Sequence, residues 1–110
     1  MLDLTRLNDI TFDIKLNDEL IVNIKKPNNA MYNELFGLVR LIEKDNANIE
    51  GLTNATYEFL TGMVNRNKQN QTFTRQEVEE YFPLDVAMYV IKEYQAWGNK
   101  SVEALRDGNF

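Results

Sequence analysis

Apolar and polar residues alternate through the first quarter of the chain, and this period of two gives way to a helical period after Pro27. Between residues 10 and 26 nearly every second side chain is apolar, with one interruption at Asn17 and Asp18. Such alternation places the apolar side chains on one face of a β-strand. The pattern therefore predicts a β-hairpin over about residues 10–26. A hairpin alone is marginally stable in water, so the helices that follow must cover its apolar face.

Pro27 ends the second strand, because proline has no N–H to donate to a sheet. Asn28 or Asn29 can cap the helix that follows. Apolar residues at helical spacing predict a first helix over about residues 29–44. Gly37 lies inside this helix and is expected to permit close packing of a neighbouring helix.

A polar break at residues 45–48 precedes a second predicted helix, which runs from near Thr53 to about Asn67. Gly62 lies inside it and is likewise expected to permit close helix packing. Residues 68–71 read Lys-Gln-Asn-Gln, a composition typical of a solvated loop.

Thr74 and Glu77 have the three-residue spacing of a capping box. In this motif the hydroxyl and the carboxylate each bind a free backbone N–H at the start of a helix. The spacing predicts a short third helix that ends at about Tyr81.

Pro83 suits the first turn of a fourth helix, which is expected over about residues 84–98. Its apolar residues, Trp97 among them, spread over an arc of about 160° on a helical wheel, wider than the ~100° stripe of a surface helix. Gly98 followed by Asn99 predicts the end of this helix. Residues 99–110 are then either a short helix or a flexible tail.

Length and composition predict one domain over residues 1–110. With 110 residues, 44% of them hydrophobic, the chain can build one core. The predicted fold is α+β and mainly α-helical, with an N-terminal β-hairpin packed on a bundle of about four helices. The absence of cysteine excludes disulfides, and no run approaches the ~20 apolar residues of a membrane span. The first nine residues include acidic ones where a signal peptide would be basic, so a cytoplasmic location is expected.

The residue types disfavour catalysis. The chain has no histidine and no cysteine, and Ser101 is its one serine. These side chains supply most proton shuttles, nucleophiles and transition-metal ligands, so we expect no enzyme, no cofactor and no metal. Glu79 and Glu80 are adjacent and point about 100° apart on a helix, which is typical of a solvated face. The net charge of −5 is spread along the chain, so nucleic acid is not an expected partner.

Several large apolar side chains fall outside the predicted core stripes. Phe36, Phe59 and Tyr89 project toward the polar sides of their predicted helices, and Trp97 belongs to the wide stripe of the last helix. Aromatic side chains at helix edges are common anchors of protein interfaces. These four residues are the candidate interaction residues, and they favour self-association or binding of another protein.

The layout of the chain resembles the tail assembly chaperones of long-tailed, siphovirus-like bacteriophages and prophages. The resemblance rests on the hairpin that closes on residues 24–27 (Ile-Lys-Lys-Pro) and on the helices in the middle. It also rests on residues 82–87 (Phe-Pro-Leu-Asp-Val-Ala), which lead into residues 94–97 (Tyr-Gln-Ala-Trp). It covers roughly residues 10–98, and its motifs are short.

This resemblance implies a non-enzymatic protein that oligomerises and binds the tail tape-measure protein. Chaperones of this family keep the tape-measure protein soluble until the tail tube polymerises around it. They leave as tube proteins arrive. It implies a location in the cytoplasm of the bacterial host and absence from the mature virion. A longer form is commonly made by ribosomal frameshifting. Subunits joined through the last helix into a spiral or ring would suit this task.

Two other classes of function fit the same composition. One is a structural component of a phage tail or connector, which would persist in the mature particle. The other is a small regulatory module that binds one protein partner. A small-molecule enzyme would need a deep pocket with convergent carboxylates.

Overall fold

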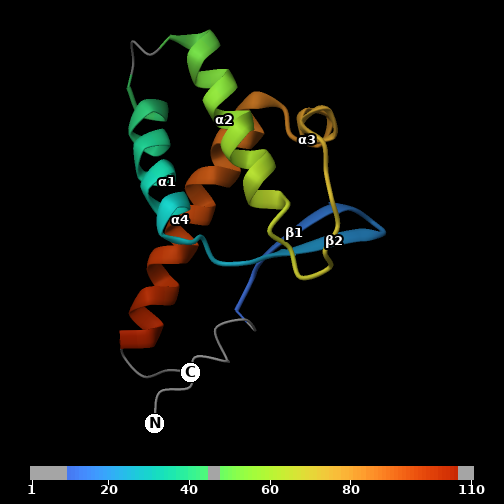
Figure 1. Cartoon of the computed structure of the whole chain (residues 1–110), viewed down its shortest axis with the longest axis vertical. Coiled ribbons are helices and arrows are strands. Elements are labelled where there is room, and N and C mark those ends of the chain that lie inside the picture. Colours follow the sequence, from blue (N-terminus) through green and yellow to red (C-terminus); the bar gives the residue numbers. More distant parts are fainter. Residues whose placement is uncertain (1–9, 45–47, 107–110) are drawn as a thin grey trace.

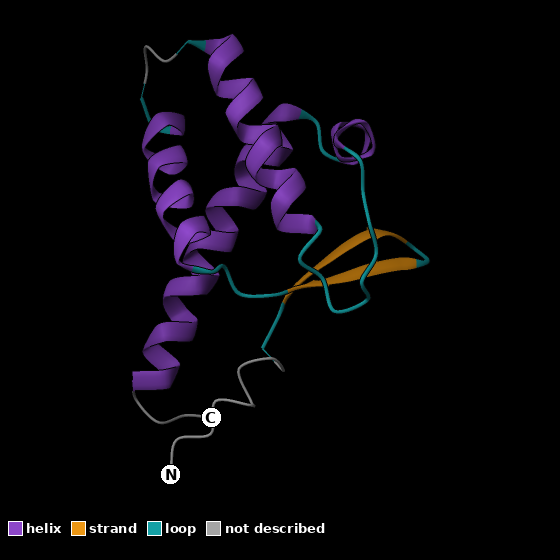
Figure 2. Cartoon of the chain, viewed as in Figure 1, coloured by secondary structure: helices purple, strands orange, loops and turns teal. Residues whose placement is uncertain are grey.

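The structure, a computed structural model, describes residues 10–44 and 48–106 and contains a hairpin followed by four helices (Figure 1). This arrangement confirms the predicted α+β fold with an N-terminal hairpin on a helical bundle. Figure 2 shows the hairpin below and to one side of the helices. The elements are β1 Phe12–Asn17, β2 Leu20–Ile24, α1 Asn29–Ile42, α2 Ile49–Val64, α3 Arg75–Tyr81 and α4 Leu84–Arg106.

The hairpin turns one apolar face toward the helices, as the alternation predicts. Its strands are antiparallel, with Phe12 opposite Ile24. Val22 and Ile24 on β2 have no exposed surface, whereas Ile21, directly before Val22, is 52% exposed. The period of two therefore separates a buried face from a solvated one.

The hairpin turn consists of Asp18 and Glu19, one residue later than predicted. Asn17 ends β1, and its side-chain Oδ1 accepts a hydrogen bond of 2.8 Å from the backbone N–H of Glu19. The pairing register shifts between Lys15 and Asn17, so β1 carries an extra residue at this end. The asparagine side chain thus closes the turn without a glycine.

The backbone that follows α2 lies along the second edge of β2. The N–H of Lys25 donates to the carbonyl of Arg66 at 2.7 Å, and the N–H of Lys68 donates to the carbonyl of Asn23 at 3.0 Å. These bonds fix the end of α2 to the hairpin.

Two asparagine side chains hold the connection between α2 and α3. Asn67, only 2% exposed, donates from Nδ2 to the carbonyls of Val64 and Gln71, each at 2.8 Å, and accepts from the N–H of Gln71 at 2.9 Å. Asn65 pairs in the same two-way manner with the backbone of Phe73, at 3.0 and 2.7 Å. The loop over residues 68–71 is exposed, as expected. The bonds of Asn67 to Gln71 and of Asn65 to Phe73 hold it at both ends.

Two helix starts follow the predicted capping. The side chain of Asn28 accepts from the N–H of Met31 at 2.9 Å at the start of α1. At the start of α3, the N–H of Glu77 donates to the hydroxyl of Thr74 at 3.2 Å, and the N–H of Thr74 donates to Oε1 of Glu77 at 3.0 Å. The capping box is therefore confirmed.

α2 occupies residues 49–64 and not the predicted 53–67. It begins early because the Asn48 side chain accepts from the backbone N–H three residues later, at 3.2 Å, and so caps the helix. Of the expected polar break, residues 45–47 lie outside the described residues.

The prediction that α4 ends at Gly98 is wrong, because the helix continues to Arg106. Gly98 is buried beneath Tyr32 of α1, and a Cβ atom built on it would lie 3.5 Å from the Tyr32 hydroxyl. The glycine therefore lies in a contact between two helices, where the sequence pattern suggested a stop. The predicted tail over 99–110 is helical up to Arg106, and residues 107–110 lie outside the described part.

α4 is the longest helix, with 23 residues and a length of about 34 Å. It crosses behind α1 and α2, and its last turns extend past the start of α1 (Figure 1). In the described ranges, no helix combines the length and the apolar character needed to cross a membrane.

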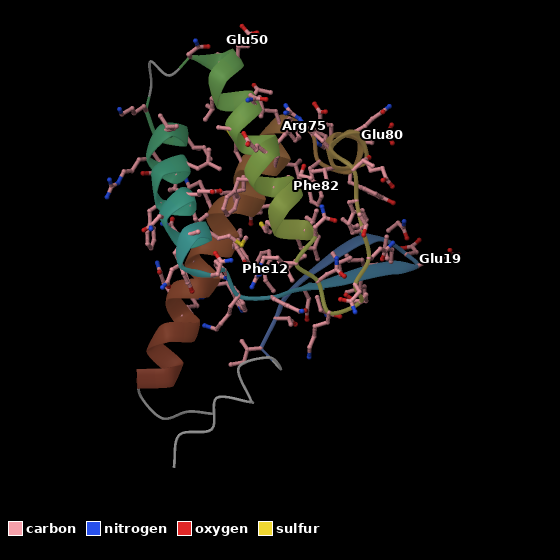
Figure 3. The ribbon with its side chains drawn as sticks, viewed as in Figure 1. Phe12, Glu19, Glu50, Arg75, Glu80 and Phe82 are labelled. Carbon is pink, nitrogen blue, oxygen red and sulfur yellow. The ribbon has the colours of Figure 1, made fainter. Side chains whose placement is uncertain are left out.

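Tyr94 of α4 joins the hairpin to the helices. Its ring is completely buried, lies edge-on to Phe12 at 5.4 Å between centroids, and stacks on Trp97 at 5.6 Å. Its hydroxyl donates to the carbonyl of Lys25 at 2.6 Å. Phe12 points from β1 toward the helices (Figure 3).

The core of the described residues is apolar. The apolar residues with no exposed surface are Val22, Ile24, Leu35, Leu60, Met63, Ala87, Ile91 and Tyr94.

Replacing Asn67 by alanine is expected to lower the free energy of unfolding by roughly 2–4 kcal/mol, because three hydrogen bonds are lost in a buried setting. Urea denaturation of both proteins measures the difference. Asn99→Ala, at an exposed position of α4, is the control and is expected to change stability by less than about 0.5 kcal/mol. Equal stability of N67A and the parent chain would contradict the structural role of Asn67.

Stability is expected to fall at alkaline pH in part through Tyr94. Burial raises the pKa of its hydroxyl above the ordinary 10.0, so the folded chain favours the neutral form. This stabilisation is complete below about pH 10, near the unfolded pKa, and is lost as the pH rises toward the folded pKa. Tyr94→Phe should therefore flatten the decline of unfolding free energy above pH 10.

The measurement is urea denaturation at several pH values between 8 and 11, a range chosen around the ordinary tyrosine pKa of about 10. Tyr89→Phe, which removes an exposed hydroxyl, is the control. A Y94F profile as steep as that of the parent chain would disprove the assignment to Tyr94.

Candidate functional site

Two of the four predicted interaction residues are exposed. Phe36 on α1 is 40% exposed and stacks on Tyr32, with ring centroids 6.0 Å apart. Tyr89 on α4 is 64% exposed and lies one helical turn from Val86, which is also exposed. Phe36 and Tyr89 thus lie on different helices, α1 and α4.

The prediction that Phe59 faces solvent is wrong, because this ring is only 6% exposed. A helix with a single buried stripe would leave Phe59 on its solvent-exposed side. α2, however, contacts α1, α3, α4 and β2, so its buried positions extend around much of the helix. They are Leu52, Thr56, Tyr57, Phe59, Leu60, Met63 and Val64.

Trp97 is half-buried and serves mainly to attach the hairpin to α4. Its ring lies 5.7 Å from that of Phe12 and 5.6 Å from that of Tyr94. Lys26 Nζ lies 5.7 Å from the Trp97 ring, in cation–π geometry. Burial lowers the pKa of Lys26, since a partly desolvated ammonium is harder to keep charged.

A groove lies between α1 and α2, which run antiparallel and contact each other (Figure 1). Its cavity volume is about 380 Å³. The residues that line it are Asn33, Glu34, Gly37, Leu38, Leu41, Ala55, Glu58 and Phe59. Phe59, expected at a surface contact, thus forms part of the groove's interior wall.

The groove has an apolar interior and acidic sides. Leu38 and Phe59 are buried within it, while Leu41 is 41% exposed. Glu34 on α1 and Glu58 on α2 are exposed, and no lysine or arginine is among the lining residues. This distribution of polarity is that of a surface for an apolar partner.

Gly37 keeps the groove open. A Cβ atom built on Gly37 would meet no other element within 4 Å, and the same holds for Gly62. The expectation of close helix packing at these two glycines is therefore wrong. The sequence signal available for this groove is weak: Gly37 lies in mid-helix one turn after Glu34, and the pattern alone does not distinguish it from Gly62.

The titratable groups with shifted pKa values belong to the fold. Hydrogen bonds from Thr11 and Asn23 lower the pKa of Asp13 in the hairpin. Burial raises the pKa of Tyr57, whose hydroxyl donates to the carbonyl of Phe82 at 2.7 Å. Within residues 10–44 and 48–106, no three carboxylates gather where they could hold a metal ion.

Comparison with protein-family models, with curated proteins and with solved structures finds no match to this chain.

Alanine substitutions at Phe59 and Phe36 should lower the unfolding free energy by different amounts, because Phe59 is buried and Phe36 is partly exposed. Phe59→Ala is expected to cost about 3–5 kcal/mol of unfolding free energy, since a buried ring leaves a cavity. Phe36→Ala is expected to cost less than about 1 kcal/mol, because much of its ring is already in water. Thermal or urea unfolding of both variants measures this, and equal costs would contradict the different burial of the two rings.

Proposed function

We propose that this chain is a non-enzymatic tail assembly chaperone that binds apolar helical segments of the tape-measure protein in the groove between α1 and α2. The groove carries the proposal, because it offers an apolar interior along two adjacent helices. The resemblance of residues 10–98 to tail assembly chaperones supplies the identity of the client.

The spread of apolar surface agrees with a client that must be covered and later released. Large apolar side chains are exposed on β2 and on each helix, and one of them, Leu41, also lines the groove. They are Ile21, Phe36, Leu41, Ile49, Tyr81, Val86 and Tyr89. Many modest contacts, repeated over several subunits, give strong total binding while each contact remains reversible.

Self-association is the second part of the proposal. Val86 and Tyr89 lie one turn apart on α4, and both are exposed. Identical subunits joined head to tail through this helix would form a ring or an open spiral, with the client along its inner surface. In this proposal the assembly works in the bacterial cytoplasm, releases the client as tail tube proteins arrive, and is absent from the mature virion.

Co-expression with the client tests the proposal. A tape-measure fragment from the same genome is expressed alone and with this chain, and its soluble fraction is measured. We expect the chain to raise that fraction several-fold and to sediment as larger assemblies as its concentration rises. A chain that stays monomeric and leaves the fragment insoluble would refute the proposal.

Two arginine substitutions test whether client binding takes place in the groove. Gly37→Arg places a long side chain in the groove at a position where a Cβ atom would meet no other element, so the variant should fold and lose client binding. Thr72→Arg adds the same charge at an exposed loop position and should keep it. Persistence of the chain in purified virions would instead identify a structural component of the tail.

A further inference from the structure

We infer that the occupant of the α1–α2 groove is an amphipathic helix with basic side chains along both flanks of its apolar stripe. The inference rests on the proposed function, in that the helix is a segment of the bound client. It adds a chemical requirement that the apolar groove alone does not impose.

The shape of the groove suits a helix. On α1 the lining residues run from Asn33 to Leu41, about 12 Å at 1.5 Å per residue. The opposite wall comes from α2, between Ala55 and Phe59. In helix-in-groove recognition an amphipathic helix lays its apolar face into such a groove, and its side chains at every third or fourth position enter it.

The positions of the polar groups argue against a small polar ligand. Sites for such ligands place a few polar groups at the base of the pocket, where they converge on the bound molecule. Here the base is formed by Leu38 and Phe59, both less than a tenth exposed. Asn33, Glu34 and Glu58 are exposed. They would therefore meet the flanks of an occupant and not its centre.

The charges on these flanks have one sign. Within the described residues, neither Glu34 nor Glu58 forms an ion pair, whereas Glu43 pairs with Lys92 at 3.9 Å and Glu79 with Arg75 at 3.8 Å. The two free carboxylates come from different helices, one on each side of the groove. A helix with lysine or arginine on both sides of its apolar stripe would pair with both of them.

The expected effect is moderate, since exposed ion pairs are individually weak. Two such pairs change a dissociation constant by about tenfold at low salt. Salt should reduce this preference, because the Debye length falls from about 10 Å at 0.1 M to about 3 Å at 1 M. The apolar stripe would supply the remaining affinity.

The test uses two synthetic helical peptides that share the same leucine and alanine stripe, one with lysine on both flanks and one with glutamate. Fluorescence anisotropy with the full chain measures binding of each at low and high sodium chloride. We expect the lysine peptide to bind about tenfold more tightly at low salt, with the difference falling to about twofold at high salt.

Matched variants assign this preference to the groove. Glu34→Gln with Glu58→Gln should remove most of it, whereas Glu19→Gln with Glu80→Gln, an equal change of net charge, should keep it. Figure 3 shows Glu19 at the hairpin tip and Glu80 on the outer side of α3. Thermal unfolding of each variant verifies that all four substitutions leave the fold intact.

The outcomes separate this inference from the proposed function. If both peptides bind equally and Gly37→Arg abolishes both, the groove takes apolar helices and the charge requirement is overturned. If the lysine peptide is preferred equally by both double variants, the preference comes from net charge and the inference is again overturned. If the preference is lost only in E34Q/E58Q while the tape-measure fragment stays insoluble, the inference holds and the chaperone proposal fails.

Discussion

The fold depends on burying the apolar face of a two-stranded hairpin that could not persist alone in water. Tyr94 is central to this contact, because its ring packs on Phe12 of β1 and its hydroxyl holds the carbonyl of Lys25. Lys25 follows β2 directly and precedes the proline that leads into α1. One side chain in the middle of α4 therefore fixes the end of the hairpin and the starting position of the first helix.

Short-range sequence patterns predicted the buried face of the hairpin and the start of α3. The alternation before Pro27 identified which face of the hairpin is buried, and the pair Thr74 and Glu77 located the start of α3. Both features depend on residues at most a few positions apart. The end of α4 could not be predicted in this way, because Gly98 followed by Asn99 has the pattern of a common helix stop. At Gly98 the ring of Tyr32, from a distant part of the chain, takes up the space that glycine leaves.

The candidate site was predictable only in part, for the same reason. Helical wheels placed Phe36 and Tyr89 on exposed surface, since α1 and α4 present outer faces at those positions. They misplaced Phe59, because α2 is surrounded by other elements on several sides. The groove itself exists through the relative placement of α1 and α2, so Glu34 and Glu58 have no shared feature in the sequence that would connect them.

The covering of β2 has a consequence for colloidal behaviour. Exposed strand edges are templates for intermolecular sheet growth, which leads to aggregates. The backbone of Arg66 and Lys68 occupies the edge of β2 that β1 leaves open, and Asn67 holds that backbone in place. The hairpin thereby presents one fewer open edge to which a strand of another chain could add.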